Sequence, residues 1–241
     1  MTEGGKRIMV ALDFDSLEKA SSMARLLKGK VGGFKVGHEL NMVAGPPALI
    51  KEFGSDILLD LKIKDKPKTV AATVKAAARQ QVKMLTLMCD GGRTMLEAAR
   101  EAAEDVHAQT GHKLLLIGVT VLSSLTDKEV YETGIDKELG IDDLVEELTM
   151  LAIETNLDGI VCSPQELPLA KEMTEFKKML VITPGIRRLG DKMSGQKRTH
   201  RPADAIRRGA DILVIGEPIT RAAFPLYVVE EIVAEIDKTL A

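Results

Sequence analysis

The feature of this chain that most restricts its fold is a regular alternation of short apolar runs with longer amphipathic ones. Each short run holds four to seven residues that are mostly apolar, as expected of parallel strands covered on both faces. The expected strands are Ile8–Leu12, Gly33–Val36, Ile57–Leu61, Met84–Met88, Leu114–Thr120, Gly159–Cys162, Leu180–Thr183 and Ile212–Ile215.

The segments between these runs have the spacing of amphipathic helices. In the first of them, Leu17, Ala20, Met23, Ala24 and Leu27 recur at intervals of three and four residues, which places them on one helical face. The expected helices are Ser16–Lys28, Leu40–Phe53, Thr69–Gln81, Thr94–Gln109, Ile141–Thr155, Pro164–Phe176, Ala203–Arg208 and Leu226–Thr239.

Eight successive strand–helix units favour a closed (β/α)8 barrel, a TIM barrel, over an open sheet. The chain has 241 residues, close to the roughly 250 of one such barrel. An open doubly wound sheet usually has fewer strands and a glycine-rich turn after the first one, whereas this turn reads Asp13-Phe14-Asp15-Ser16. No linker or change in composition divides the sequence, so we expect a single domain over residues 1–241.

Charge and cysteine content argue against several other classes. The 33 Lys and Arg residues stand against 36 Asp and Glu, a net charge of −3, and a nucleic-acid or membrane-surface partner would favour a basic excess. No apolar run approaches the roughly 18 residues of a membrane span, and the polar segment Met1–Arg7 does not resemble a signal peptide. Cys89 and Cys162 are expected to be buried reduced thiols. We expect a cytoplasmic protein with a small-molecule partner.

Several charged residues close otherwise apolar runs, an arrangement that is costly unless the charges are paired or functional. Functional groups of such barrels lie at the carboxyl ends of the strands. Asp60 and Lys62, two apart on one strand, are expected to point to the same side; Lys35 ends the neighbouring strand and Asp65 follows in the loop. These positions predict an alternating chain, Lys35–Asp60–Lys62–Asp65, that fixes the Lys62 ammonium. A purely structural ion network is disfavoured because buried pairs stabilise weakly. Asp13 fits a ligand role or a helix N-terminus.

The residues around this cluster resemble the orotidine 5'-monophosphate decarboxylase family. Asp60–Thr69 matches its D-x-K-x-x-D-x-P-x-T signature; the D-x-K-x-x-D part alone is shared with sugar-phosphate relatives. Pro67, Thr69 and the motif Thr183–Arg187 favour the nucleotide enzyme. The resemblance extends along nearly the whole chain through Ala11–Asp13, Phe34–Gly37, Val119–Ser124, Asp158–Ser163 and Val214–Pro218.

The resemblance implies decarboxylation of orotidine 5'-monophosphate (OMP) to UMP in pyrimidine biosynthesis, without metal or organic cofactor. Lys62 would donate the proton to pyrimidine C6, which suits a carbon on which negative charge develops. Asp60 would orient Lys62 and crowd the departing carboxylate, and Lys35 would bridge Asp60 and the ribose. Asp65 and Thr69 would reach the active site of a second subunit, so the resemblance implies a homodimer.

The family pattern also implies a set of substrate contacts, some on the long loop over residues 184–202. Ser123 would read the pyrimidine edge, Gln196 would close over base and phosphate, and Arg187 with the Gly216 backbone would hold the phosphate. The substrate-binding positions implied are Asp13, Lys35, Thr69, Ser123, Pro184, Arg187, Gln196, Gly216 and Glu217.

One position departs sharply from the family. Its motif after the eighth strand is usually G-R-P, with the arginine on the phosphate, but this chain has Gly216-Glu217-Pro218. A carboxylate repels a phosphate dianion, so we expect weakened phosphate binding and a gain in kcat/KM for the variant Glu217→Arg. Alternatively, Glu217 points away, or another arginine substitutes. The candidates are Arg187, Arg188 and Arg221.

Two other functions stay open at this point. A Mg2+-dependent sugar-phosphate lyase of the same superfamily would want further acidic ligands near Asp60 and Asp65, and an Ala-Gly pair where this chain has Lys66-Pro67. A non-catalytic nucleotide-binding paralogue is favoured by Glu217 and disfavoured by the intact Lys62. The four histidines show no metal-ligand spacing.

Overall fold

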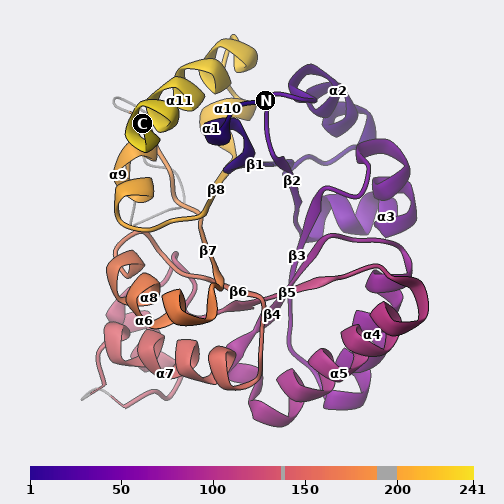
Figure 1. Ribbon diagram of the computed structural model, residues 1–241, viewed down its shortest axis with the longest axis vertical. Coiled ribbons are helices and arrows are strands. Elements are labelled where there is room, and N and C mark those ends of the chain that lie inside the picture. Colours follow the sequence, from indigo (N-terminus) through magenta and orange to yellow (C-terminus); the bar gives the residue numbers. More distant parts are fainter. Residues whose placement is uncertain (137–138, 189–199) are drawn as a thin grey trace.

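Eight parallel strands close into a barrel with helices around it (Figure 1). The structure is a computed structural model that describes residues 1–136, 139–188 and 200–241. Each strand pairs with its neighbours in sequence, and β1 pairs with β8 to close the ring. The strands are β1 (Ile8–Ala11), β2 (Gly33–Val36), β3 (Ile57–Ile63), β4 (Met84–Met88), β5 (Leu115–Val119), β6 (Gly159–Val161), β7 (Leu180–Thr183) and β8 (Ile212–Ile215). The predicted (β/α)8 barrel is therefore confirmed, and the open sheet is ruled out.

Eight helices lie at the positions expected between and after the strands. They are α2 (Leu17–Leu27), α3 (His38–Phe53), α4 (Pro67–Arg79), α5 (Arg93–Thr110), α7 (Ile141–Glu154), α8 (Leu167–Thr174), α9 (Pro202–Arg207) and α11 (Pro225–Leu240). Most bounds differ from the predicted ones by one to three residues, and the predicted segment Pro164–Phe176 ends instead in a short 3-10 turn, η2 (Glu175–Lys177). None of the helices in the described ranges combines the length and apolar character needed to cross a bilayer.

Within the described residues, four short helical elements were not predicted. They are α1 (Glu3–Lys6), α6 (Asp127–Glu132), α10 (Glu217–Thr220) and the 3-10 turn η1 (Cys89–Gly91). Segments of three to six residues are too short to show a helical period. Of these, α10 matters most for function, because it follows β8 directly at the mouth of the barrel.

The apolar residues of each strand divide between two cores. Alternate residues of a strand face opposite sides, so in β1 Ile8 and Val10 pack against the surrounding helices while Met9 faces the barrel interior. The interior cluster also includes Leu58, Met84, Ile117 and Ile182. Since both faces are buried, the strands read as almost continuous apolar runs, and polar side chains stand out where they interrupt them.

Helix α3 is broken where the sequence contains two consecutive prolines. The segment is helical on both sides, but Gly45 has φ 68° and ψ 157°, and Pro46 and Pro47 follow it. Proline cannot donate to the preceding turn, and its ring clashes with that turn. The predicted helix Leu40–Phe53 is thus present in extent but kinked at Gly45.

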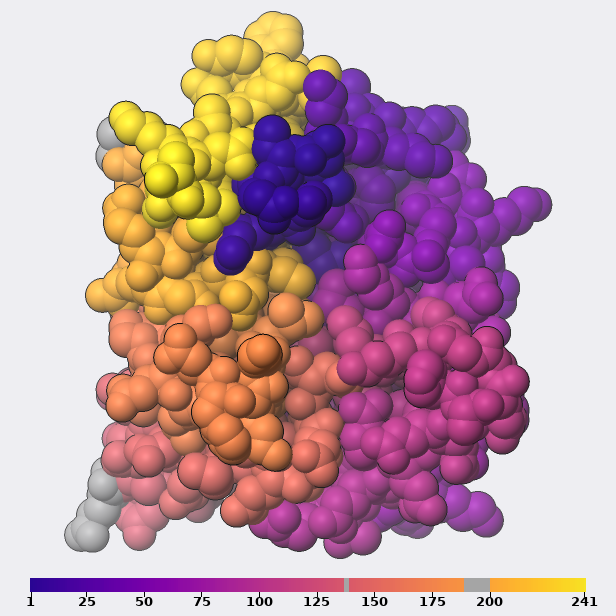
Figure 2. Space-filling view, viewed as in Figure 1, coloured from indigo at the N-terminus to yellow at the C-terminus, as the bar shows by residue number. Residues whose placement is uncertain are grey.

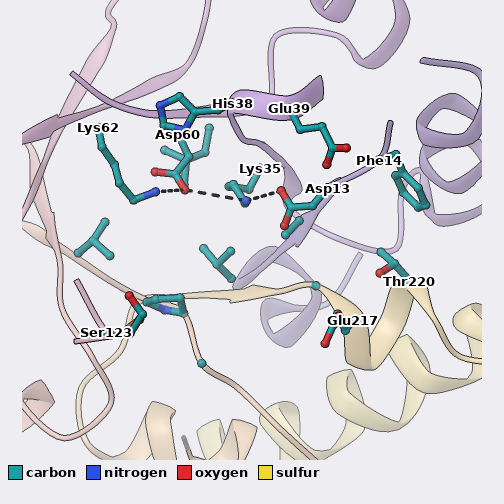
Figure 3. A pocket seen from close by; sticks show the side chains of 18 of the residues that line it. Asp13, Phe14, Lys35, His38, Glu39, Asp60, Lys62, Ser123, Glu217 and Thr220 are labelled. Atoms are coloured by element: carbon teal, nitrogen blue, oxygen red, sulfur yellow. Dashed lines mark hydrogen bonds and ion pairs between the residues drawn. The ribbon is translucent and has the colours of Figure 1, made fainter. Parts of the chain in front are cut away.

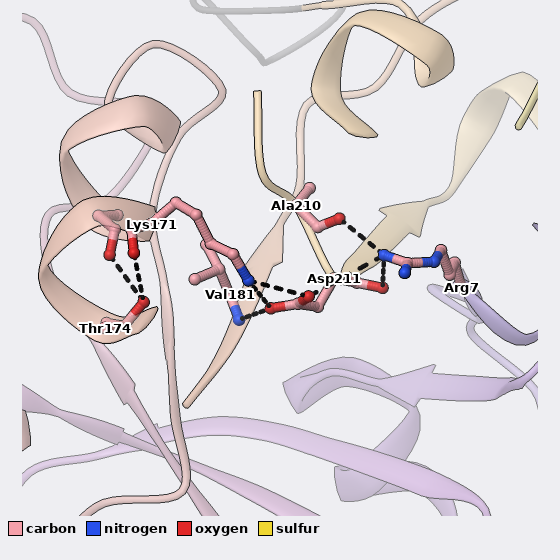
Figure 4. Close-up of polar contacts among 7 residues, drawn as sticks. Arg7, Lys171, Thr174, Val181, Ala210 and Asp211 are labelled. Atoms are coloured by element: carbon pink, nitrogen blue, oxygen red, sulfur yellow. Dashed lines mark hydrogen bonds and ion pairs between the residues drawn. The ribbon is translucent and has the colours of Figure 1, made fainter. Parts of the chain in front are cut away.

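Carboxylates at the amino ends of strands tie neighbouring strands together. Asp211, just before β8, accepts a hydrogen bond from the backbone N–H of Val181 at 2.9 Å. Its side chain also lies 3.3 Å from the Lys171 ammonium, and Arg7 donates to the backbone carbonyl of Ala210 (Figure 4). These contacts lie at the opposite end of the strands from the carboxyl termini and therefore stabilise the fold rather than the site.

The chain ends lie against each other. The backbone N–H of Gly4 donates to the Asp237 carboxylate of α11 at 2.7 Å. In Figure 2 the N-terminal residues, in indigo, accordingly abut the yellow C-terminal helix.

Both cysteines are buried and neither is in a disulfide, which confirms the prediction of reduced thiols. Burial raises the pKa of the Cys89 thiol to about 12, with a smaller contribution from the nearby Asp90 carboxylate. This thiol therefore stays protonated at physiological pH.

Candidate active site

A cavity of about 960 Å3 opens at the carboxyl ends of the strands. Its wall combines strand ends with the loops that follow β1, β2, β5, β7 and β8, as in barrel enzymes generally. Of the substrate contacts that the sequence predicts, those in the wall are Asp13, Lys35, Ser123, Pro184, Arg187, Gly216 and Glu217. Asp60 and Lys62 line it as well.

A row of alternating charges crosses one side of the cavity (Figure 3). The Lys62 ammonium lies 2.8 Å from Asp60 Oδ2, and Lys35 Nζ lies 3.9 Å from the same oxygen. Lys35 also donates to Asp13 Oδ1 at 2.7 Å. The side chains of Lys35 and Asp60 are 10% and 16% exposed, and that of Lys62 is 32% exposed. The two inner charges are thus shielded from water, while the Lys62 ammonium reaches the open space.

Three of the four charged residues predicted to form a chain are therefore in contact, and the fourth is not. Lys35, Asp60 and Lys62 lie in contact as expected, but the row ends at Asp13 rather than at Asp65. Asp65 and Thr69 are exposed and do not line the cavity. Asp65 accepts a hydrogen bond from the backbone N–H of Lys66 at 2.5 Å.

Lys62 reaches Asp60 through an irregular strand rather than through simple alternation. The pairing of β3 with β4 changes register between Leu59 and Ile63, and Lys62 has φ 46°, in the left-handed region. This conformation is unfavourable for a residue with a side chain, and such strain recurs at functional sites. The prediction that the two side chains converge is right, but a bulge brings them together.

Thr86 on β4 holds the bulge in place. Its hydroxyl accepts a hydrogen bond from the backbone N–H of Lys62 at 2.8 Å and donates one to Asp60 Oδ1 at 3.0 Å. Thr86 is completely buried, so its hydroxyl has no water to bind in place of these two groups. One hydroxyl thus positions the backbone of the lysine and one oxygen of the carboxylate that binds the lysine.

Gly37, which ends the second strand motif, lies against the ion pair between Asp13 and Lys35. A Cβ at this position would lie 3.1 Å from Asp13 Oδ1 and 3.3 Å from Lys35 Nζ. Its φ of −88° is open to any residue, so close packing rather than backbone freedom favours glycine here.

Two arginines of the predicted phosphate region lie in the cavity wall and one lies outside it. Arg187, after β7, donates from Nη1 to the backbone carbonyl of Ile186 at 2.9 Å. Arg221, at the end of α10, pairs with Glu217 at 2.9 Å. Arg188 instead pairs with Glu231 of α11 and is not in the wall. Gln196 lies outside the described residues.

Some wall residues had no predicted role. His38 and Glu39, at the start of α3, line the cavity, and so does Thr220 of α10. Thr86 could have been noticed as the polar residue that interrupts an apolar run on the strand beside Asp60, but its two hydrogen bonds depend on a bulge that the sequence does not reveal. In the described part of the chain, no three His, Cys, Asp or Glu side chains converge as a metal site would require.

Comparison with known proteins places this geometry in a family. The model of the Orotidine 5'-phosphate decarboxylase / HUMPS family matches residues 6–232. An orotidine 5'-phosphate decarboxylase from Hahella chejuensis is 40% identical over 237 residues, 97% of this chain and 98% of the relative. One from Pseudomonas paraeruginosa is 41% identical over 231 residues, 95% of this chain and 97% of the relative.

Solved structures agree with the sequence relatives. The orotidine 5'-phosphate decarboxylase of Lactobacillus acidophilus superposes with a TM-score of 0.80 at 31% identity, covering 95% of this chain and 98% of that one. An uncharacterized conserved protein from Geobacillus kaustophilus has a TM-score of 0.80 at 32% identity, covering 95% and 99%. The chain therefore belongs to the Orotidine 5'-phosphate decarboxylase / HUMPS family.

Proposed function

We propose that this protein is an orotidine 5'-phosphate decarboxylase, which converts OMP to UMP and CO2 as a single barrel domain. The observation that carries the proposal is the Lys62 ammonium, held 2.8 Å from Asp60 at the open end of the barrel. Full-length relatives of that name at about 40% identity support the choice of substrate.

The chemistry needs a cation at the carbon that loses its carboxylate. When the bond between C6 and the carboxyl carbon breaks, CO2 leaves and the electron pair stays on C6. Lys62 stabilises that charge as it develops and then transfers a proton to C6, which gives UMP and a neutral amine that regains a proton from water. A charge fixed in this position stabilises the transition state more than a mobile one, because it needs no reorganisation during the reaction.

Asp60 has two roles in this proposal. It holds Lys62 through Oδ2, and its negative charge lies where the substrate carboxylate would be repelled. Departure of CO2 relieves that repulsion, so the transition state is favoured over the bound substrate. Lys35 links Asp60 to Asp13, and in this proposal Asp13 accepts hydrogen bonds from the ribose hydroxyls.

The remaining contacts follow from the wall of the cavity. Ser123 lies across from Lys62 and Asp60 (Figure 3), where the pyrimidine edge would lie. In such barrels the loops after the seventh and eighth strands commonly hold a phosphate. In this chain the loop after β7 contains Pro184 and Arg187, and the segment after β8 contains Gly216 and Glu217. Gln196 is proposed to close over base and phosphate.

We further propose a homodimer in which Asp65 and Thr69 complete the partner's site. Their exposure outside the cavity of their own subunit fits this arrangement. Mixing inactive Lys62→Ala and Asp65→Ala proteins tests it, because random exchange of subunits leaves about a quarter of the sites with both residues intact. Recovery of activity on mixing is expected, and none is expected if each subunit uses its own Asp65.

The enzymatic proposal is tested by incubating the purified protein with OMP and following the fall in absorbance of the pyrimidine. Turnover that is unchanged by EDTA is expected for a cofactor-independent decarboxylase of a cytoplasmic pathway. Binding of UMP without turnover would instead identify a nucleotide-binding paralogue, the function that Glu217 favours. Lyase activity on a sugar phosphate that requires added Mg2+ would identify the sugar-phosphate branch that shares the D-x-K-x-x-D motif.

A further inference from the structure

The charges in the cavity wall balance, which is unexpected for a site that binds an anion. Among the described residues of the wall, five side chains are acidic and five are basic. The substrate of the proposed function carries a carboxylate and a phosphate, so it meets no net attraction from these groups. A lining cation that exchanged a protein carboxylate for the substrate phosphate would supply attraction that the balanced wall lacks.

Three of the five cations are poorly placed for the substrate phosphate. Lys35 and Lys62 belong to the charge row at the reacting end of the site. Lys19 lies on α2, away from the loops after β7 and β8 that commonly hold a phosphate. Its ammonium is 2.8 Å from Asp15, in the loop just before this helix, and their hydrogen bond lowers the pKa of Asp15 and raises that of Lys19. The two arginines, Arg187 after β7 and Arg221 after β8, lie on the loops where a phosphate is expected.

Arg221 is the better placed of the two for an exchange of partners. Its guanidinium is 2.9 Å from the Glu217 carboxylate, and the two side chains are 77% and 37% exposed. An ion pair this exposed is weak in water, whereas an arginine binds a phosphate through two parallel charge-assisted hydrogen bonds. Arg187 instead donates to the backbone of its own loop.

We propose that Arg221 binds the substrate phosphate and that Glu217 competes with the phosphate for this arginine. This inference rests on the proposed function, because OMP is the ligand that carries the phosphate. Both residues line the cavity from α10, one helical turn apart. In the absence of substrate, Glu217 holds the guanidinium at the mouth. In its presence the carboxylate is displaced but stays near the phosphate, so it reduces the contribution of the phosphate to binding.

The test compares OMP with orotidine, the same substrate without its phosphate. Arg221→Gln is expected to raise KM for OMP by about tenfold or more, the loss of a charge-assisted pair, and to leave orotidine unaffected. Glu217→Gln is expected to lower KM for OMP by about fivefold and likewise to leave orotidine unaffected. Arg207→Gln is the matched control, because Arg207 pairs with Asp204 on α9 outside this cavity.

A double variant separates competition from simple repulsion. If Glu217 acts through Arg221, the benefit of Glu217→Gln shrinks in the Arg221→Gln background, whereas plain repulsion of the phosphate gives the same benefit in both backgrounds. Equal benefits would overturn the competition, and an unchanged KM for OMP in Arg221→Gln would overturn the phosphate role. If Arg221→Gln does not fold, Arg221→Lys replaces it, with an intermediate KM expected because lysine lacks the two-pronged geometry.

Calorimetric titration with UMP and with uridine distinguishes failure of this inference from failure of the proposed function. A wild-type protein that releases no CO2 would refute the decarboxylase, yet a loss of UMP affinity in Arg221→Gln, with uridine unaffected, would still support the phosphate role. Equal UMP affinities in wild type and variant would refute the role of Arg221 whatever the turnover.

Discussion

Replacing Thr86 with valine removes one hydroxyl and keeps the shape of the side chain. In the wild type this hydroxyl binds the Lys62 backbone N–H at 2.8 Å and Asp60 Oδ1 at 3.0 Å. Leaving each of the two partners unsatisfied costs about 1–3 kcal/mol, so we expect the free energy of unfolding to fall by about 2–6 kcal/mol. If about half of that loss applies to the stabilisation of the transition state by Lys62, kcat/KM for OMP falls by about fivefold or more.

Steady-state kinetics and urea unfolding measure the two effects. Thr174→Val is the matched control, because Thr174 is also completely buried but its hydroxyl donates only to backbone carbonyls, such as that of Ala170 at 2.8 Å. The control should lose stability with little change in kcat. A Thr86→Val enzyme with wild-type kcat and KM would refute the idea that this hydroxyl positions Lys62 and Asp60.

Three further outcomes follow from particular contacts. Gly37→Ala should lower kcat/KM by about fivefold, or about 1 kcal/mol, because the new Cβ crowds the ion pair of Asp13 and Lys35; an unaltered value would mean that this pair tolerates displacement. Asp211→Ala should reduce the free energy of unfolding by about 1–3 kcal/mol in a urea titration without changing kcat, since it acts at the far end of the barrel. Cys89, whose pKa is raised to about 12 by burial, should resist iodoacetamide at pH 8 in the folded protein and react after unfolding; rapid reaction in the native state would contradict its burial.

The barrel could be predicted from the sequence because both faces of its strands are buried. Runs such as Ile8–Ala11 are therefore apolar throughout, and a polar residue in such a run is conspicuous. The same contrast identified Lys35, Asp60 and Lys62 as candidates. Their positions on neighbouring strands sufficed to predict their contact, because adjacent parallel strands end at the same edge of the barrel.

The rest of the site depends on features that no local pattern encodes. The left-handed backbone of Lys62 and the register shift of β3 arise from pairing with β4, so the role of Thr86 was not visible in the sequence. Asp65 was expected to join the charge row from its spacing alone, but the chain turns outward after the bulge. The pairing of Glu217 with Arg221 was not predicted, because it depends on α10. This helix has four residues and is too short to be recognised by periodicity.

The central claim is that the Lys62 ammonium, fixed by Asp60, both stabilises the developing charge and supplies the proton. The most direct measurement is the rate of CO2 release from OMP by Lys62→Ala, with UMP binding measured in parallel to show that the site is otherwise intact. We predict a fall in kcat of at least about a thousandfold with UMP still bound. Undiminished CO2 release by this variant would contradict the account.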